Sequence, residues 1–331
     1  MLDHLVRALQ HVSSGYENYV RFAAMRTLLA PAARHSLSIG TRCADQIARF
    51  LAATTYEGAV VRNQMEAAYG ATRAPALTRG WFARPLRDFV FLRRVLTGRQ
   101  VLRPDLVEHT GSSAARQEAL RTGPVILATG HFARQAVITL LSPAVTPGLL
   151  GQVTLHPPGR SLRPYPLRMG LQFGTFLRTQ AAVRGAAGTF IYTVAGGQTG
   201  LDLFRHLVKL RGKVSVALDA PWSRDRDIPH QRAFAGQSRA VFSLGPVRLS
   251  RVTQTPVVLA IPYLGEGGRT VIEWHGPFAP PPPEAWEAEA ALCDLLLDRI
   301  ETAVGERPTQ YVMKIGGQRR WDDAARQWRP R

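Results

Sequence analysis

Residues 124–131 combine a short apolar run with a histidine directly behind it. Pro124 to Ala128 is apolar and partly β-branched, and it stops at Thr129-Gly130, which is the pattern of a buried strand ending in a tight turn. His131 follows that turn, and the apolar run 136–141 predicts a helix that ends before Pro143. Open α/β sheets bind their ligands at such strand ends, although a structural histidine gives the same pattern.

Further apolar runs of strand length alternate with helical stretches. The predicted strands are residues 124–128, 151–155, 212–219, 256–261 and 270–274, and the predicted helices between them include 113–120 and 201–210. This alternation favours an α/β fold with a mostly parallel central sheet flanked by helices on both faces. A final amphipathic helix places one apolar face inward, formed by Trp286, Ala290, Cys293, Leu297, Ile300 and Val304, and its acidic residues, Glu289 among them, elsewhere.

Residues 1–100 have a different texture, rich in Ala, Leu and Arg and poor in strand-like alternation. The segment 81–96 is a strongly apolar helix flanked by arginines, which fits a core face or a membrane-facing surface. Leu2, Leu5, Val6 and Leu9 share a helical face that lies on a membrane or packs on its own domain. We therefore expect an N-terminal helical cap (1–100), an α/β core (101–317) and a basic tail (318–331).

The net charge of the 331-residue chain is +18, which favours an anionic partner: nucleic acid, anionic lipid or an acidic protein. The basic residues are scattered and are nearly all arginine, as a GC-rich genome can produce, so nucleic acid is the least favoured of the three. No segment near the N-terminus has the length of a signal peptide core or a membrane span. Cys43 and Cys293 form no metal or redox motif, which suits a reducing cytoplasm.

Four stretches, in this order along the chain, resemble the lysophospholipid acyltransferase superfamily, and within it the late acyltransferases of lipid A biosynthesis. They are Val61–Tyr69 with its Arg-Asn-Gln element, Leu127–Phe132 with the histidine, Leu210–Pro221, and the closing Pro-Thr-Gln-Tyr of Arg307–Tyr311. Ala233–Gly236, Phe242–Pro246 and Thr255–Val258 extend the third stretch. No single piece is specific, but the ordered set covers nearly the whole chain.

The resemblance implies a glycerolipid acyltransferase-like fold, with His131 as the general base that activates an acceptor hydroxyl or amine. A neutral imidazole suits this role because its ordinary pKa, about 6.5, lies near working pH. The implied donor is acyl carrier protein or acyl-CoA, and the implied acceptor is a lipid or glycolipid. The implied location is the cytoplasmic side of the bacterial inner membrane, as a peripheral protein on an anionic surface. No metal, cofactor or nucleic acid is implied.

One residue departs from the family pattern of a histidine followed, five positions later, by an acid: here that position is Ala136. Three readings remain open. Asp219, which ends the predicted strand 212–219, supplies the carboxylate from a different strand; or His131 works unaided on a more acidic acceptor; or the chain binds acyl groups, lipid or acyl carrier without transferring them. Asp219 could also cap a turn or pair with Arg224.

Three further residues are candidates for substrate binding. Arg134 stands three positions after His131, where the family usually has a neutral residue, so it either binds a phosphate or carboxylate of the substrate or faces solvent. Gly236 and Arg239 resemble the region that meets the acceptor head group in the superfamily.

Overall fold

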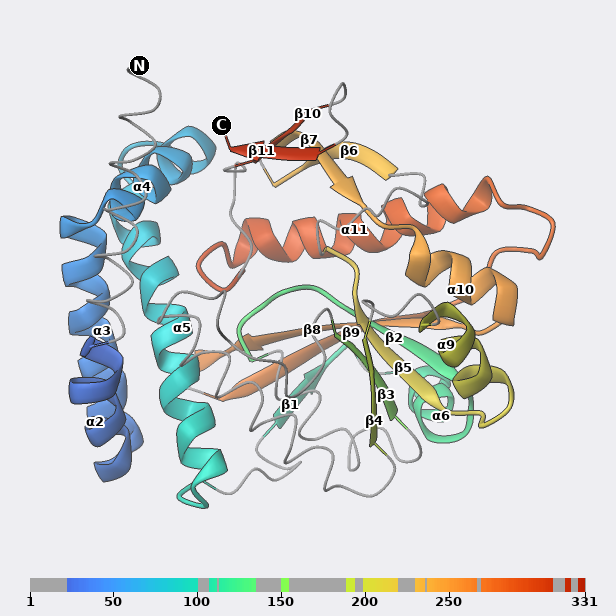
Figure 1. Cartoon of the computed structure of the whole chain (residues 1–331), viewed down its shortest axis with the longest axis horizontal. Coiled ribbons are helices and arrows are strands. Elements are labelled where there is room, and N and C mark those ends of the chain that lie inside the picture. The colour runs from blue at the N-terminus through green and yellow to red at the C-terminus, as the bar shows by residue number, and fades with distance from the viewer. Residues whose placement is uncertain are drawn as a thin grey trace. The chain divides into compact units, whose positions relative to one another are not determined.

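The computed structural model describes residues 23–100, 107–111, 113–134, 150–154, 189–193, 199–219, 230–235, 237–266, 269–311, 319–322 and 327–330. The described residues up to 100 belong to one compact unit and those from 107 onward to a second. Figure 1 shows the helices of the first unit and the sheet of the second.

The first unit is helical. Its elements are the π-helix η1 (Met25–Leu29) and the α-helices α2 (Ala30–His35), α3 (Leu37–Thr54), α4 (Tyr56–Tyr69) and α5 (Ala74–Leu96). Ser36 and Thr55 cap α3 and α4 with their side-chain oxygens, which satisfies N–H groups that a helix start leaves open. Arg87 of α5 binds Asp45 of α3 through two hydrogen bonds of 2.7 and 2.8 Å.

The apolar segment predicted at 81–96 lies within α5, and its large side chains are mostly buried. Trp81, Phe82, Phe89 and Val90 are each at most 8% exposed. Arg84, expected beside this face, is buried with them: burial lowers the pKa of its guanidinium to about 10, against the opposing charge of Asp88. This segment is therefore a packing face rather than an exposed one.

The second unit is built on a seven-stranded sheet with the strand order β1-β9-β8-β2-β5-β3-β4. The strands are β1 (Val107–Thr110), β2 (Val125–Thr129), β3 (Leu150–Thr154), β4 (Thr189–Thr193), β5 (Lys213–Ala217), β8 (Val257–Leu264) and β9 (Thr270–Phe278). The five neighbouring strands β8, β2, β5, β3 and β4 run parallel to one another. Strand β9 is antiparallel to β8, and β1 is parallel to β9. The expectation of an α/β fold with a mostly parallel sheet is thus confirmed.

The reversal at β9 has a simple cause in the connection that precedes it. Only residues 265–269 join β8 to β9, and Gly265 donates a backbone hydrogen bond of 2.9 Å to Arg269. A parallel crossover needs a dozen or more residues, so a link this short can only return the chain as an antiparallel hairpin.

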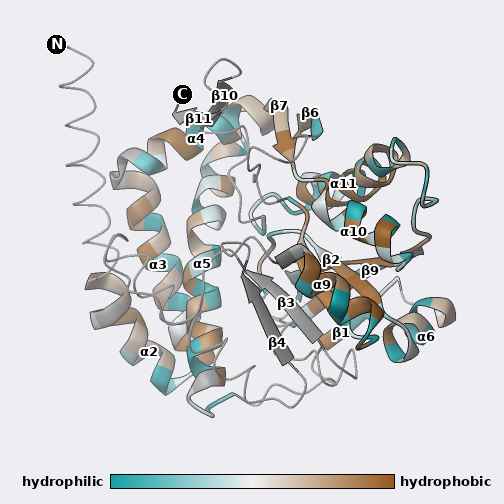
Figure 2. Ribbon diagram, turned by 45° about the vertical axis from the view of Figure 1, so that its right-hand side comes forward, coloured by the Kyte–Doolittle hydropathy of each residue, from teal (hydrophilic) through white to brown (hydrophobic). Residues whose placement is uncertain are grey.

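Among the described residues, four helices accompany the sheet: α6 (Ala114–Thr122), α9 (Thr199–Val208), α10 (Gly245–Thr253) and α11 (Ala288–Glu306). Helix α10 contacts both α9 and α11, and α6 contacts β9. Figure 1 shows α10 and α11 above the sheet and α6 below it. All five residues of β2 are buried, and Figure 2 shows the hydrophobic colour on this central part of the sheet. The core of the unit therefore lies around β2 and β8.

The final helix differs from its predicted face at three positions, one of which is Ala290, whose side chain is only partly buried. Trp286 is 66% exposed, because α11 begins only at Ala288 and the helical periodicity does not extend back to it. Glu289, expected outside the buried face, is 2% exposed, and Arg248 and Arg251 of α10 reach its carboxylate at 3.4 and 2.6 Å. Cys293, Leu297, Ile300 and Val304 are buried as predicted.

Two short antiparallel pairs complete the description: β6 (His230–Phe234) with β7 (Gln237–Phe242), and β10 (Arg319–Asp322) with β11 (Gln327–Pro330) in the basic tail. The helix predicted at 136–141 and the apolar face of Leu2 to Leu9 lie outside the described residues. Within the described ranges, no helix combines the length and the apolar character needed to cross a bilayer.

Candidate active site

His131 and Asp219 meet because their two strands are neighbours that run in the same direction. In the β2–β5 pair, Thr129 lies opposite Ala217, and Leu218 N–H donates to the carbonyl of Thr129 at 2.9 Å. The carboxyl ends of parallel strands meet at one edge of a sheet. The residues two positions beyond this register are His131 on one strand and Asp219 on the other, so the register brings both side chains to that edge.

The Asp219 carboxylate holds His131 at two points. Its Oδ2 accepts the backbone N–H of His131 at 2.8 Å, and its Oδ1 lies 2.6 Å from Nδ1 of the ring. The Asp219 side chain is fully buried, whereas the His131 side chain is 27% exposed. Because Asp219 occupies Nδ1, the imidazole presents Nε2, which makes no hydrogen bond to any described residue.

This contact sets the electrostatics of the imidazole. Burial alone lowers the pKa of His131, but the negative charge of Asp219 and the hydrogen bond to it outweigh burial and raise the pKa above its ordinary value of 6.5. The carboxylate thus stabilises the imidazolium that forms when the ring takes up a proton.

Tyr311 completes the surroundings of the carboxylate. It is 3% exposed, and burial, the charge of Asp219, a hydrogen bond to Asp219 and the charge of Glu301 all raise its pKa well above its ordinary value. The phenol is therefore neutral, and its O–H donates a hydrogen bond to the Asp219 carboxylate. The sequence placed Tyr311 in the closing motif 307–311 but gave it no role, and its spacing from Asp219 offers no signal for one.

The turn that carries His131 is tightly packed. Phe132 N–H donates to the carbonyl of Gly130 at 2.9 Å, which closes a narrow turn at the end of β2. A Cβ at Gly130 would lie 2.9 Å from the ring of Phe132 and 3.3 Å from Ile300 of α11. The glycine between the strand and the histidine is therefore required by this close approach.

The remaining predicted site residues are placed as follows. Arg134 is 6% exposed with φ of 66°, so the reading in which it faces solvent is wrong: its side chain is buried in a turn with left-handed backbone. The backbone of Arg239 lies in β7. Gly236, Arg224, Ala136 and the side chain of Arg239 lie outside the described residues.

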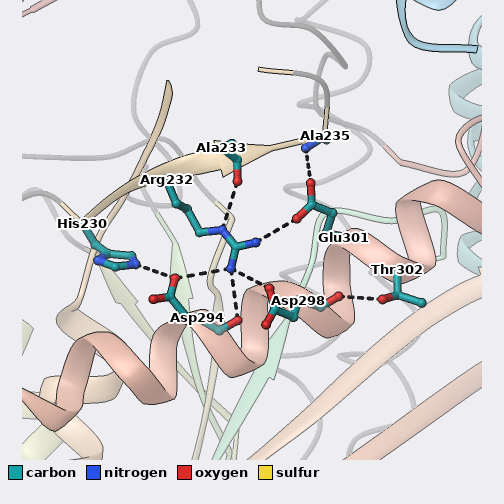
Figure 3. Close-up of polar contacts among 8 residues, drawn as sticks. All are labelled: His230, Arg232, Ala233, Ala235, Asp294, Asp298, Glu301 and Thr302. Atoms are coloured by element: carbon teal, nitrogen blue, oxygen red, sulfur yellow. Dashed lines mark hydrogen bonds and ion pairs between the residues drawn. The ribbon is translucent and has the colours of Figure 1, made fainter. Parts of the chain in front are cut away.

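A second polar cluster ties the β6–β7 hairpin to α11, as Figure 3 shows. Arg232 of β6 reaches Asp294, Asp298 and Glu301 at 3.3, 2.7 and 2.8 Å. Glu301 also accepts the backbone N–H of Ala235 at 2.7 Å, and His230 lies 2.7 Å from Asp294. Burial lowers the pKa of Arg232, but the hydrogen bond to Asp298 and the three carboxylate charges outweigh it and raise that pKa. Sequence analysis did not single out this cluster.

No group of three or more His, Cys, Asp or Glu side chains in the described part of the chain is arranged to hold a metal ion. What the described geometry offers is a histidine oriented by a buried carboxylate, with a tyrosine hydroxyl behind it. Comparison with known proteins finds no family model that matches the chain and no curated protein that matches it.

Proposed function

We propose that the chain is an acyltransferase that moves a fatty acyl chain from a carrier thioester to a hydroxyl or amine of a lipid-like acceptor. The observation that supports it is the two-point contact of Asp219 with His131. The sequence resemblance calls for a histidine general base with an acid partner. Ala136 stands where the family has that acid, and we propose that Asp219, just after β5, takes its place. We also propose that the second unit has an acyltransferase-like fold. An α/β sheet with His131 directly after a central strand is compatible with that fold.

The proposed reaction follows from the orientation of the ring. Nε2 of His131 takes the proton of the acceptor O–H or N–H, and the acceptor atom attacks the thioester carbonyl carbon. The tetrahedral intermediate then collapses, the C–S bond breaks, and the leaving thiolate takes the proton from the imidazolium. Asp219 holds the Nδ1–H tautomer and stabilises the imidazolium, as a carboxylate does in a serine-hydrolase triad.

The proposed partners are acyl carrier protein or acyl-CoA as donor and a lipid or glycolipid as acceptor. We place the protein peripherally on the cytoplasmic side of the bacterial inner membrane, where a net charge of +18 attracts both anionic lipid and an acidic carrier. Buried Arg134, close in sequence to His131, is the proposed contact for an anionic group of the substrate, and Gly236 and Arg239 are proposed near the acceptor head group.

The test is transfer and thioester hydrolysis with acyl carrier protein and coenzyme A donors. His131→Ala should abolish turnover, and Asp219→Asn should lower it by roughly 10² to 10⁴, because the amide neither fixes the tautomer nor carries the charge. His35→Ala and Asp202→Asn are the matched controls, since His35 belongs to the first unit and Asp202 pairs with Arg205 within α9. Full turnover in Asp219→Asn would refute the assigned role of the carboxylate.

The alternative is a protein of the same fold that binds acyl chains, lipid or acyl carrier without transferring the acyl group. Ala136→Glu separates the two proposals. If Asp219 is the working acid, the new carboxylate adds little, because Nδ1 of His131 already has its partner. A wild type that binds acyl chains without turnover, and becomes active in Ala136→Glu, would establish the binding protein instead.

A further inference from the structure

The segment Gln310–Tyr311 joins three parts of the second unit at the dyad. The Gln310 side chain makes two hydrogen bonds to the backbone of Leu264 at the end of β8. Its Nε2 donates to the Leu264 carbonyl at 3.1 Å, and its Oε1 accepts the Leu264 N–H at 3.2 Å. The Gln310 backbone carbonyl accepts the N–H of Ala133 at 2.7 Å, and Phe132 and Tyr311 form an antiparallel bridge. The loop that carries His131 is therefore fixed to β8 through residues 310 and 311.

The ring of Tyr311 is held from two sides. Its centroid lies 5.3 Å from that of Phe132 and 6.3 Å from that of Phe234, and both phenylalanines are at most 2% exposed. Aromatic contacts at these distances favour a fixed relative orientation. The hydroxyl at the end of this fixed ring meets Asp219, so the carboxylate receives donors from the His131 ring, the His131 backbone and Tyr311.

We propose that Tyr311 is a positioning residue of the His131–Asp219 dyad, whose hydroxyl anchors the buried carboxylate while Phe132 and Phe234 fix its ring. A fully buried carboxylate needs donors in place of water, and a donor that partly offsets its charge limits how strongly it attracts a proton onto the neighbouring imidazole. Tyr311 thus sets the basicity of His131 without touching the substrate. The proposal depends on the proposed function only for its kinetic consequence.

The charged and titratable groups around this carboxylate come from several elements. They are His131 after β2, Tyr311 after α11, and Glu301 on α11, whose charge acts on Tyr311 and which Arg232 of β6 pairs at 2.8 Å. Tyr311→Phe leaves all of the others in place and keeps the aromatic ring. It therefore changes one donor alone.

The direct test is a titration of the His131 ring by NMR in wild type and Tyr311→Phe. The chain has nine histidines, and the His131 signal is identified by its loss in His131→Gln. Without the hydroxyl, Asp219 exerts its full charge on the imidazolium, so the pKa of His131 should rise above its wild-type value. If the wild-type protein is active, the acid limb of the pH–rate profile should lie at higher pH in Tyr311→Phe than in wild type.

Tyr263→Phe is the matched control, since it removes a hydroxyl from a ring on β8 that Arg307 covers at 4.0 Å. It should leave the His131 titration unchanged. Incorporation of 3-fluorotyrosine at position 311 gives a test of opposite sign, because a more acidic phenol is a stronger donor and should lower the pKa of His131. An unchanged or lower pKa in folded Tyr311→Phe would overturn the proposal. The titration needs no turnover, so this failure is distinct from a failure of the proposed activity.

Discussion

The raised pKa of His131 links activity and stability to pH in opposite directions. The proposed base must be neutral, so kcat/KM should increase as pH rises through a pKa that lies above 6.5. The ion pair of protonated His131 with Asp219 stabilises the folded state. This contribution to stability is fully present below the pKa of about 6.5 in the unfolded chain, and it is lost as pH rises through the pKa of His131 in the folded protein. Wild type should therefore exceed His131→Gln in unfolding free energy by more at about pH 5.5 than at about pH 9.

Chemical denaturation at the two pH values measures this difference, with His35→Gln, on the exposed side of α2, as the control. A stability gap between wild type and His131→Gln that is equal at both pH values, or wider at the higher one, would contradict the raised pKa.

Gly130 offers a test of the packing behind the histidine. A methyl group at this position meets Phe132 at 2.9 Å, and that ring is 1% exposed and cannot move freely. Gly130→Ala should destabilise the protein by about 1–3 kcal/mol, the usual range for overpacking. Gly305→Ala, near the end of α11 with open space around its Cβ position, should be neutral or slightly stabilising. Thermal unfolding compares the two; equal melting temperatures would show that the His131 turn adapts.

Part of this site could be predicted from the sequence and part could not, for physical reasons. His131 was readable because a buried strand, a Gly turn and a histidine are contiguous. The contact of Asp219 with His131 depends on β2 and β5 being neighbours in register, which local pattern leaves open among several readings. Tyr311 lies far along the sequence from Asp219 and Phe132, so no local pattern links them, and Arg134 looks like a surface residue until its turn is seen to bury it.

In the second unit the central apolar strands were predicted, whereas β1, β4 and the β6–β7 hairpin were not. The buried strands β2, β5 and β8 and the helices α6, α9 and α11 lie within a few residues of their predicted bounds. Strand β1 reads Val-Glu-His-Thr, with two exposed residues at its centre, so neither apolar content nor alternation marks it. The β6–β7 hairpin is stabilised by α11, whose acidic residues lie more than fifty positions away.

Arg232 should therefore decide whether this hairpin stays on α11. Arg232→Met removes the cation shared by Asp294, Asp298 and Glu301 and leaves three carboxylates close together. Because these acids are partly exposed, we expect a loss of about 1–2 kcal/mol, less than for a fully buried pair. Arg232→Lys should recover only part of it, since an ammonium cannot reach three acids with a planar fork.

Denaturation at low and high salt measures this loss, and salt should reduce it. Arg121→Met is the control, since its pairing with Glu118 on α6 is more than half exposed and should contribute little. A loss for Arg232→Met no larger than that control would show that the hairpin is held by its apolar residues.

For the whole chain, the net charge of +18 is the property that the fold does not explain, and it bears on the proposed location. A large positive charge draws the protein to an anionic bilayer over a screening length of about 10 Å at 0.1 M salt. Binding to phosphatidylglycerol-containing vesicles should therefore weaken as salt rises, while neutral phosphatidylcholine vesicles bind poorly at every salt concentration. Vesicle co-sedimentation measures both, with duplex DNA as the competing polyanion. Steeply salt-dependent binding to DNA without binding to anionic vesicles would favour nucleic acid as the partner and remove the membrane from the proposal, because simple charge attraction would have served both.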